Sequence, residues 1–241
     1  MSDDADTPAP PPLSRETAHA FLRGRRSVRR YRPGRPPDAV LHRIFCSVAM
    51  APSAHNRQPW RFFVIRDRAL AARLATAMGE RLAADRRRDG DPEEAIAQDV
   101  ARAFARITGA PVVILVALTM AEMDTYPDAA RGAAEHLMAV QSTAMATQNL
   151  LLAAHAEGLG TCWMCAPMFC PDAVRSVVPV PSDWELQGLV TLGRPAAPGR
   201  DKPRKALPEF VRLGPVATGA DDPDADSAWT DSTAADTEPR A

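Results

Sequence analysis

The chain has 241 residues, of which 46% are hydrophobic and 24% charged, a composition typical of a globular protein. No uninterrupted apolar stretch reaches the roughly 18 residues of a membrane-spanning helix, which argues against a membrane protein. The N-terminus lacks the basic and apolar regions of a secretory signal, so we expect a cytoplasmic protein with reduced cysteines.

The net charge of −1 conceals an uneven distribution. Residues 1–12 carry three Asp and no base, and residues 217–241 carry seven acids and one Arg, a net of −6. Residues 13–216 are therefore +8, which indicates an anionic ligand such as nucleic acid, phosphate or a phosphorylated cofactor. We expect one domain at 13–216 between disordered tails at 1–12 and 217–241, because neither end has much to bury.

Capping residues and apolar spacing predict the first elements along the chain. Ser14 can cap a helix that runs through 21–22, and Asp38 can cap a second helix. After a loop at 51–59, we expect a strand at 61–66, a helix at 67–83, a charged and mobile connection at 84–95, a helix at roughly 93–108 and a buried strand at 110–118.

The longest predicted helix covers 135–157 and carries no formal charge between its terminal glutamates. Gly158 is placed to end it. Apolar residues occur around nearly the whole circumference of this helix, so we expect a central helix that its own domain, or a second subunit, covers on several sides. Two further strands at 161–164 and 186–192 follow, and the lack of strict βα alternation favours an α+β fold.

A basic stretch, RRSVRR, ends the first predicted helix at residues 25–30. Guanidinium groups and a hydroxyl suit phosphate oxygens, and an extended turn would place Arg25, Ser27 and Arg29 on one side. A solvated helix end or a nucleic-acid patch would use the same residues, although no aromatic interleaving supports the latter.

The predicted loop at 51–59 is rich in hydrogen-bonding side chains, among them Ser53, Asn56 and Gln58. Amide side chains both donate and accept, as the mixed edge of a heterocycle requires. The alternative is a turn that satisfies its own polar groups in front of a buried Trp60.

A third stretch, GLGTCWMC, covers residues 158–165. Its two glycines allow backbone to approach a flat ligand, but a third glycine is missing for a dinucleotide fingerprint. Cys162 and Cys165, together with Cys170, could hold a metal or an iron–sulfur cluster. We favour free thiols, because the first two would point to opposite faces of a strand.

Several catalytic motifs are missing: HExxH, GxSxG and the P-loop do not occur, and nothing resembles a nucleophile beside a base. An enzyme with this sequence would therefore rely on a cofactor for its chemistry.

Four motifs in order resemble the nitroreductase family of FMN oxidoreductases. They are RRSVRR, PSAHNRQPWRF, the uncharged helix that leads into GLGTCWM, and LGRP followed by basic residues. The likeness spans about 25–205. It implies an α+β fold, with a mostly antiparallel sheet flanked by helices, in an intertwined homodimer with two FMN sites at the interface.

The resemblance also implies site residues. Arg25, Ser27 and Arg29 match the phosphate ligands of FMN, and Arg26 matches a contact to the ribityl chain or the ring edge. The residues that match the loop reaching the flavin of the partner subunit are Pro52, Ser53, Ala54 and Asn56. The residues that match the backbone beside the flavin N5 atom are Gly160, Thr161, Cys162 and Trp163. Arg204, or its neighbour Lys205, would complete the phosphate site.

A closer likeness joins AHNRQPWRF, the long helix and CWMCAPMFCP to the reductase domain of the bifunctional proteins that complete the deazaflavin coenzyme factor 420. That likeness implies reduction of a dehydro precursor of the coenzyme. The chain has no room for the ligase domain of those proteins.

These observations favour an FMN-dependent reductase that transfers hydride through flavin N5 by a ping-pong mechanism. NAD(P)H or a reduced deazaflavin would be the donor, and a deazaflavin precursor, a nitroaromatic compound or a quinone the acceptor. The charged segment at 84–95 could form a lid. Two alternatives stay open: a non-catalytic nucleic-acid or partner-binding module, and the flavin-fragmenting or dehalogenating chemistry of other family members.

Overall fold

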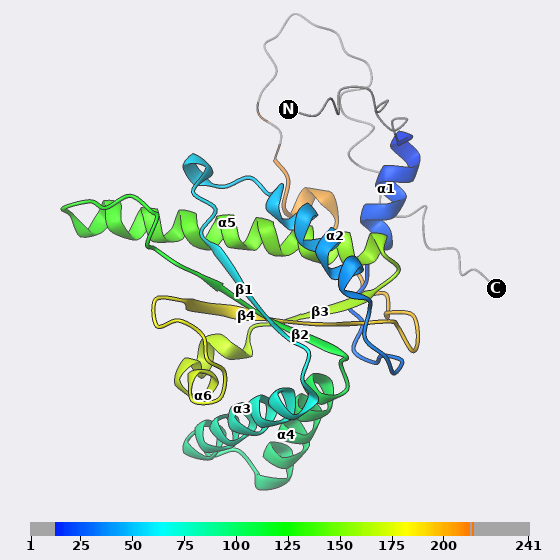
Figure 1. Cartoon of the computed structure of the whole chain (residues 1–241), viewed down its shortest axis with the longest axis vertical. Coiled ribbons are helices and arrows are strands. Elements are labelled where there is room, and N and C mark those ends of the chain that lie inside the picture. The colour runs from blue at the N-terminus through cyan, green and yellow to red at the C-terminus, as the bar shows by residue number, and fades with distance from the viewer. Residues whose placement is uncertain (1–12, 213, 215–241) are drawn as a thin grey trace, which may run out of the picture. The chain divides into compact units, whose positions relative to one another are not determined.

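The computed structural model describes residues 13–212 and Gly214, in two units (Figure 1). The first unit ends at Arg200 and contains the sheet. The described part of the second unit is an extended segment followed by a short 3₁₀ helix, η3 (Leu207–Glu209). The tails predicted at 1–12 and 217–241 lie outside the described residues.

Four antiparallel strands form the sheet, in the order β1-β2-β4-β3. Their bounds are β1 Trp60–Ile65, β2 Val112–Leu118, β3 Gly160–Met164 and β4 Glu185–Gly193. The central strand β2 is apolar and buried at all seven positions, which requires helices on both faces of the sheet. This arrangement confirms the predicted α+β fold with an antiparallel sheet.

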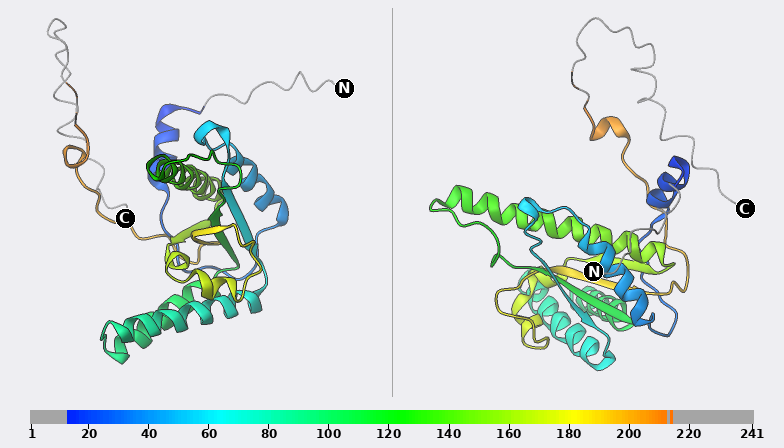
Figure 2. Two further views of the ribbon diagram at one scale, coloured as in Figure 1. Left: turned by 90° about the vertical axis from the view of Figure 1, so that its left-hand side faces the viewer. Right: turned by 45° about the horizontal axis from the view of Figure 1, so that its top comes forward.

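Helices cover the two faces of the sheet separately (Figure 2). The helices are α1 Arg15–Gly24, α2 Asp38–Ala49, α3 Arg68–Arg88, α4 Glu93–Thr108, α5 Ala129–Ala156 and α6 Pro171–Arg175, with 3₁₀ turns η1 Ala54–Asn56 and η2 Ala166–Phe169. Alternate residues of β2 pack on opposite sides: Ile114 joins the core under α2 and α5, and Leu115 joins the core over α3 and α6.

The two predicted helix caps have different outcomes. Ser14 caps α1 as expected, since its hydroxyl accepts the N–H of Thr17 at 3.2 Å. Asp38 is the first residue of α2 and not its cap, so that prediction was wrong. Pro37 precedes the helix, and the Asp38 carboxylate instead accepts two hydrogen bonds of 2.8 Å from Arg66.

The charged segment at 84–95 is the tip of a helical hairpin, so the prediction of a connection over all of these residues was wrong. Only Asp89–Pro92 separates α3 from α4. Arg86 Nε donates to Asp91 at 2.6 Å, and the same guanidinium pairs with Asp99 of α4. The charges pair within the hairpin, which packs on the face of the sheet opposite α5 (Figure 1).

The longest helix, α5, begins at Ala129, six residues before the predicted start. Asp128 caps it by accepting the N–H of Arg131 at 2.9 Å, and Gly158 follows its end with φ +69°. Its own unit does not cover it all round, because Leu137 and Met145 are 54% and 39% exposed. No helix among the described residues is both long and apolar enough to cross a membrane.

Candidate functional site

The basic stretch leaves α1 as an extended segment that lies against β3. Arg25 is the first non-helical residue, with ψ 131°, and Ser27 forms a parallel bridge with Thr161. Val28 N donates to Thr161 O at 2.8 Å, and the Val28 side chain is buried. Since side chains alternate along an extended segment, Ser27 and Arg29 face away from the side that Val28 occupies.

Gly160 permits this close approach. A Cβ atom at position 160 would lie 2.6 Å from Val28 Cβ, well inside van der Waals contact. Any larger residue would therefore push the basic segment, hereafter the basic turn (25–31), away from β3.

Tyr31 fixes the other end of the basic turn, and the sequence reasoning missed it. Its hydroxyl donates to Val28 O at 2.6 Å and shares a 2.7 Å hydrogen bond with Thr191 Oγ1 of β4. Burial raises the pKa of this phenol well above its usual range, so it stays neutral. The partner on β4 lies 160 positions along the chain, and no local pattern identifies it.

The basic turn carries uncompensated positive charge. Neither Arg25 nor Arg29 has an ion-pair partner within the part of the chain that the structure describes. Arg26 differs, because its guanidinium donates to Arg25 O at 3.2 Å and also to Arg23 O at the end of α1. The pKa of His155 is lowered by burial and also by the charges of Arg25 and Arg26.

The first residues of β3 are buried within one chain. Thr161 and Cys162 are 2% and 3% exposed, and Trp163 is half-buried. Trp163 packs its ring over Gly188, where a Cβ would lie 2.6 Å from the ring, and its Nε1 donates to Cys165 Sγ at 2.9 Å. All four cysteines are free, with Cys162 and Cys170 buried.

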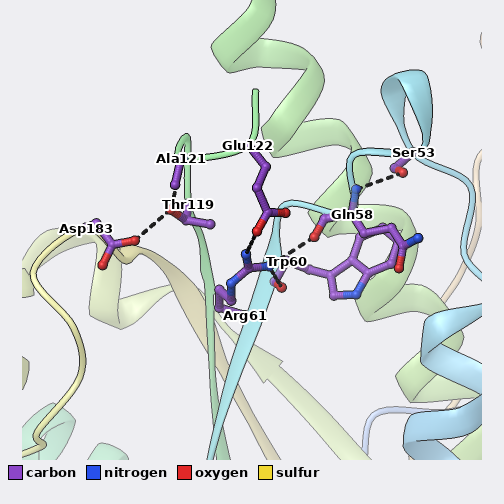
Figure 3. Close-up of polar contacts among 8 residues, drawn as sticks. All are labelled: Ser53, Gln58, Trp60, Arg61, Thr119, Ala121, Glu122 and Asp183. Carbon is purple, nitrogen blue, oxygen red and sulfur yellow. Dashed lines mark hydrogen bonds and ion pairs between the residues drawn. The ribbon is translucent and has the colours of Figure 1, made fainter. Parts of the chain in front are cut away.

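The loop that precedes β1 is the second part of the predicted site (Figure 3). Ser53 Oγ accepts the N–H of Gln58 at 3.1 Å, which leaves its own proton available for a ligand. Arg61 of β1 donates to Gln58 O at 3.0 Å and to Glu122 at 3.1 Å, so it ties the loop to the segment after β2.

The backbone of this loop is unusual. His55, Asn56 and Gln58 all have positive φ, between 48° and 55°, a conformation that non-glycine residues rarely adopt. Ala54 N donates to Ser142 Oγ of α5 at 3.2 Å, which holds the loop against that helix. Arg61 and Ser142 are positioning residues that sequence reasoning missed, because both contacts are tertiary.

Within one chain the two parts lie at diagonally opposite corners of the sheet. The basic turn contacts the edge strand β3 at Thr161, which is paired through Leu192 of β4 with Val112, the first residue of β2. The loop enters the other edge strand, β1, at Trp60, which is paired with Leu118, the last residue of β2. Strand spacings of about 4.8 Å and residue steps of about 3.3 Å separate these corners by roughly 20 Å or more.

The remaining predicted ligand, Arg204, belongs to the second unit, in the extended segment before η3. Its role at the phosphate stays a prediction.

Comparison with known proteins identifies the family. The model of the nitroreductase family matches residues 22–194. The chain belongs to this family. Membership confirms the expected fold, FMN as the cofactor and the FMN-dependent oxidoreductase class. It argues against the alternative of a non-catalytic binding module.

Two curated relatives are 5,6-dimethylbenzimidazole synthases. The one from Rhodobacter capsulatus is 34% identical over 185 residues, covering 75% of this chain and 84% of the relative. The one from Rhodospirillum rubrum is 30% identical over 211 residues, covering 84% and 90%. These names do not match the deazaflavin likeness expected from the sequence.

A solved structure has the same fold. The FMN-dependent nitroreductase NfnB from Mycobacterium smegmatis, solved with NADPH, superposes with a TM-score of 0.66 at 23% identity. The match covers 83% of this chain and 99% of that one.

The described residues fit a flavin mononucleotide. Two unpaired guanidiniums and a hydroxyl suit a phosphate dianion.

Proposed function

We propose that the protein is an NAD(P)H-dependent reductase that works as a homodimer, with each FMN held between two chains. The observation that carries this proposal is the pair of unpaired arginines, Arg25 and Arg29, on a turn that β3 holds in place.

Arginine and hydroxyl donors of the basic turn would bind the phosphate, with Arg204 as a further donor. The backbone of 160–163 would lie along the ring. FMN supplies the redox chemistry, since its reduced form carries a hydride at N5. The protein's part is to position the ring and the reactants and to exclude water, and no side chain has to act as acid or base.

The partner chain would provide the loop residues Pro52, Ser53, Ala54 and Asn56. Their corner of the sheet lies too far from the basic turn of the same chain for one flavin to contact both. The exposed apolar side of α5 supports pairing of two chains, because Leu137 and Met145 lie on it beside exposed small and amide residues.

A binding experiment tests the phosphate site. In Arg29→Ala we expect the Kd for FMN to rise by about 10- to 100-fold, the effect of losing a charge-assisted hydrogen bond. Arg30→Ala is the matched control, since this neighbour has the same charge on the opposite side of the extended segment. Fluorescence titration of FMN-free protein measures both, and equal losses in the two variants would argue against the assignment.

The donor and the acceptor are tested by anaerobic reduction. NADH, NADPH and a reduced deazaflavin are each mixed with the FMN-loaded protein, and bleaching of the band near ~450 nm reports the donor. The reduced protein is then offered a dehydro deazaflavin precursor, a nitroaromatic compound or a quinone. Reoxidation by one of them identifies the acceptor, and reoxidation by none contradicts the reductase proposal.

A second candidate function is formation of 5,6-dimethylbenzimidazole, which the two curated relatives favour. The test is aerobic incubation of the protein with FMN and NADPH, followed by chromatography and mass spectrometry for that product. Its appearance would favour the synthase, whereas acceptor reduction without it would favour the reductase.

A further inference from the structure

We propose that a second anion-binding site, separate from the FMN site, lies in a hollow at the C-terminal end of β1. The hollow has a volume of about 1010 Å³. Its walls are the loop after the basic turn, the junction of β1 with α3, and the segment that enters β2. Tyr31, which anchors the basic turn, lines the hollow, but none of the residues proposed to contact FMN does.

Four arginines line this hollow, from two separate segments of the chain: Arg32, Arg35, Arg66 and Arg68. Arg66 is paired with Asp38, but the other three have no ion-pair partner among the described residues. Three unpaired guanidiniums around one hollow create a strongly positive potential, which a bound anion would neutralise.

One acidic residue lines the hollow, and its carboxylate is already engaged. Asp67 caps α3, where its two oxygens accept the N–H groups of Ala69 and Leu70 at 3.0 and 3.2 Å. Its negative charge therefore acts mainly on the positive N-terminal end of α3 and less on the arginines. The arginines of the hollow also contribute to the +8 charge of residues 13–216, which the FMN phosphate accounts for only in part.

The wall of the hollow is partly apolar. Phe63 of β1 and Leu70 of α3 are half-buried and pack on the core, and Pro111 closes one side. An inorganic ion would leave this surface in water, whereas an aromatic body would cover it. The hollow therefore favours an organic anion, with a phosphate or carboxylate group attached to an apolar or aromatic part.

This site is distinct from the proposed phosphate site. The hollow reaches from β1 to Tyr31 and Arg32 at the end of the basic turn. The residues proposed for the FMN phosphate are Arg25, Ser27 and Arg29, which precede it in the chain, and Ser27 bridges to Thr161 of β3. Because the two sites share no proposed ligand residue, we expect that both can be filled at once. The proposed anion site is independent of which substrate the flavin reduces.

Calorimetric titration of the full-length, FMN-loaded protein with phenyl phosphate tests the proposal. We expect saturable binding that weakens with added salt and leaves the flavin spectrum unchanged. In the double variant Arg35→Ala/Arg68→Ala, the Kd should rise by about tenfold or more. The control, Arg73→Ala/Arg106→Ala, removes two exposed arginines of α3 and α4 outside the hollow and should bind like the wild type.

The same titration can overturn the proposal. Equal affinity in the hollow variant and the control would show that the arginines do not form the site. Release of FMN on titration would place the binding at the flavin phosphate instead. Inorganic phosphate that binds as tightly as phenyl phosphate would contradict the part assigned to the apolar wall.

Discussion

Tyr31 joins the basic turn to β4 through a single hydroxyl. It contacts the backbone of the basic turn at Val28 and both the side chain and the carbonyl of Thr191 on β4. A buried hydroxyl with several partners is costly to remove, because those partners lose a hydrogen bond away from water. Tyr31 is therefore a positioning residue for the arginines, without contact to the reacting atoms.

Tyr31→Phe should weaken FMN binding severalfold and lower the free energy of unfolding by about 1–3 kcal/mol. Flavin fluorescence titration and urea unfolding measure the two effects. The chain's other tyrosine, Tyr126, is exposed and gives the matched control Tyr126→Phe. Normal FMN affinity in Tyr31→Phe, together with reduced stability, would limit Tyr31 to a role in folding.

His155 should make the FMN-free protein less stable in mild acid. Its ring stacks on Phe21 at 5.0 Å, and burial, followed by Arg25 and Arg26, lowers its pKa below the usual value of about 6.5. The unfolded chain then takes up a proton more readily than the folded one, so stability falls as the pH drops below about 6.5.

His155→Gln should remove part of this loss. Urea unfolding at two values on either side of that pH measures it, with the exposed His19→Gln as the control. An unchanged pH dependence in His155→Gln would contradict the assignment.

At the scale of elements, the α3–α4 hairpin shows how charge patterning builds structure away from the site. Arg86 is 23% exposed and pairs with Asp91 in the turn and with Asp99 on α4. Partly buried pairs of this kind contribute more than exposed ones.

Arg86→Ala should lower the free energy of unfolding by about 1–2 kcal/mol and leave the affinity for FMN unchanged, because none of the residues proposed to contact FMN lies in the hairpin. Thermal unfolding and flavin titration test the two parts. The control is Arg87→Ala, whose exposed pair with Glu93 should matter less. A higher Kd for FMN in Arg86→Ala would contradict this prediction and indicate that the hairpin affects the ligand site.

At the scale of the whole molecule, the proposed site requires two chains. In the proposed homodimer, each chain would contribute its basic turn to one site and its loop to the other. A two-fold symmetric dimer satisfies both halves at once.

Mixing two impaired variants tests this arrangement. One chain carries Arg29→Ala and the other carries Ser53→Ala/Asn56→Ala, and each alone should have low activity when FMN is limiting. Random reassociation should restore about a quarter of the wild-type activity, because half of the dimers are mixed and each has one intact site. Activity no higher than that of the separate variants would mean that both halves come from the same chain.

The sequence by itself determined most of the elements, because local rules specify them. The uncharged run of β2, the Ser14 cap and Gly158 each act on immediate neighbours, and the order of four motifs identified the family. Where a local pattern had two physical solutions, the sequence was insufficient. The charges at 84–95 suit a solvated connection or paired helices, and only the nearness of α4 to α3 selected the second.

Only the tertiary structure decided how the site is divided. Sequence spacing does not say that the turn at 25–31 joins β3 while the loop before β1 lies at the opposite corner, since strand order is a non-local property. The same holds for the hydroxyl of Tyr31 and for the arginines around the hollow, whose common position follows from packing. The sequence shows which functional side chains are present, but which of them lie close together depends on how the shared apolar core is buried.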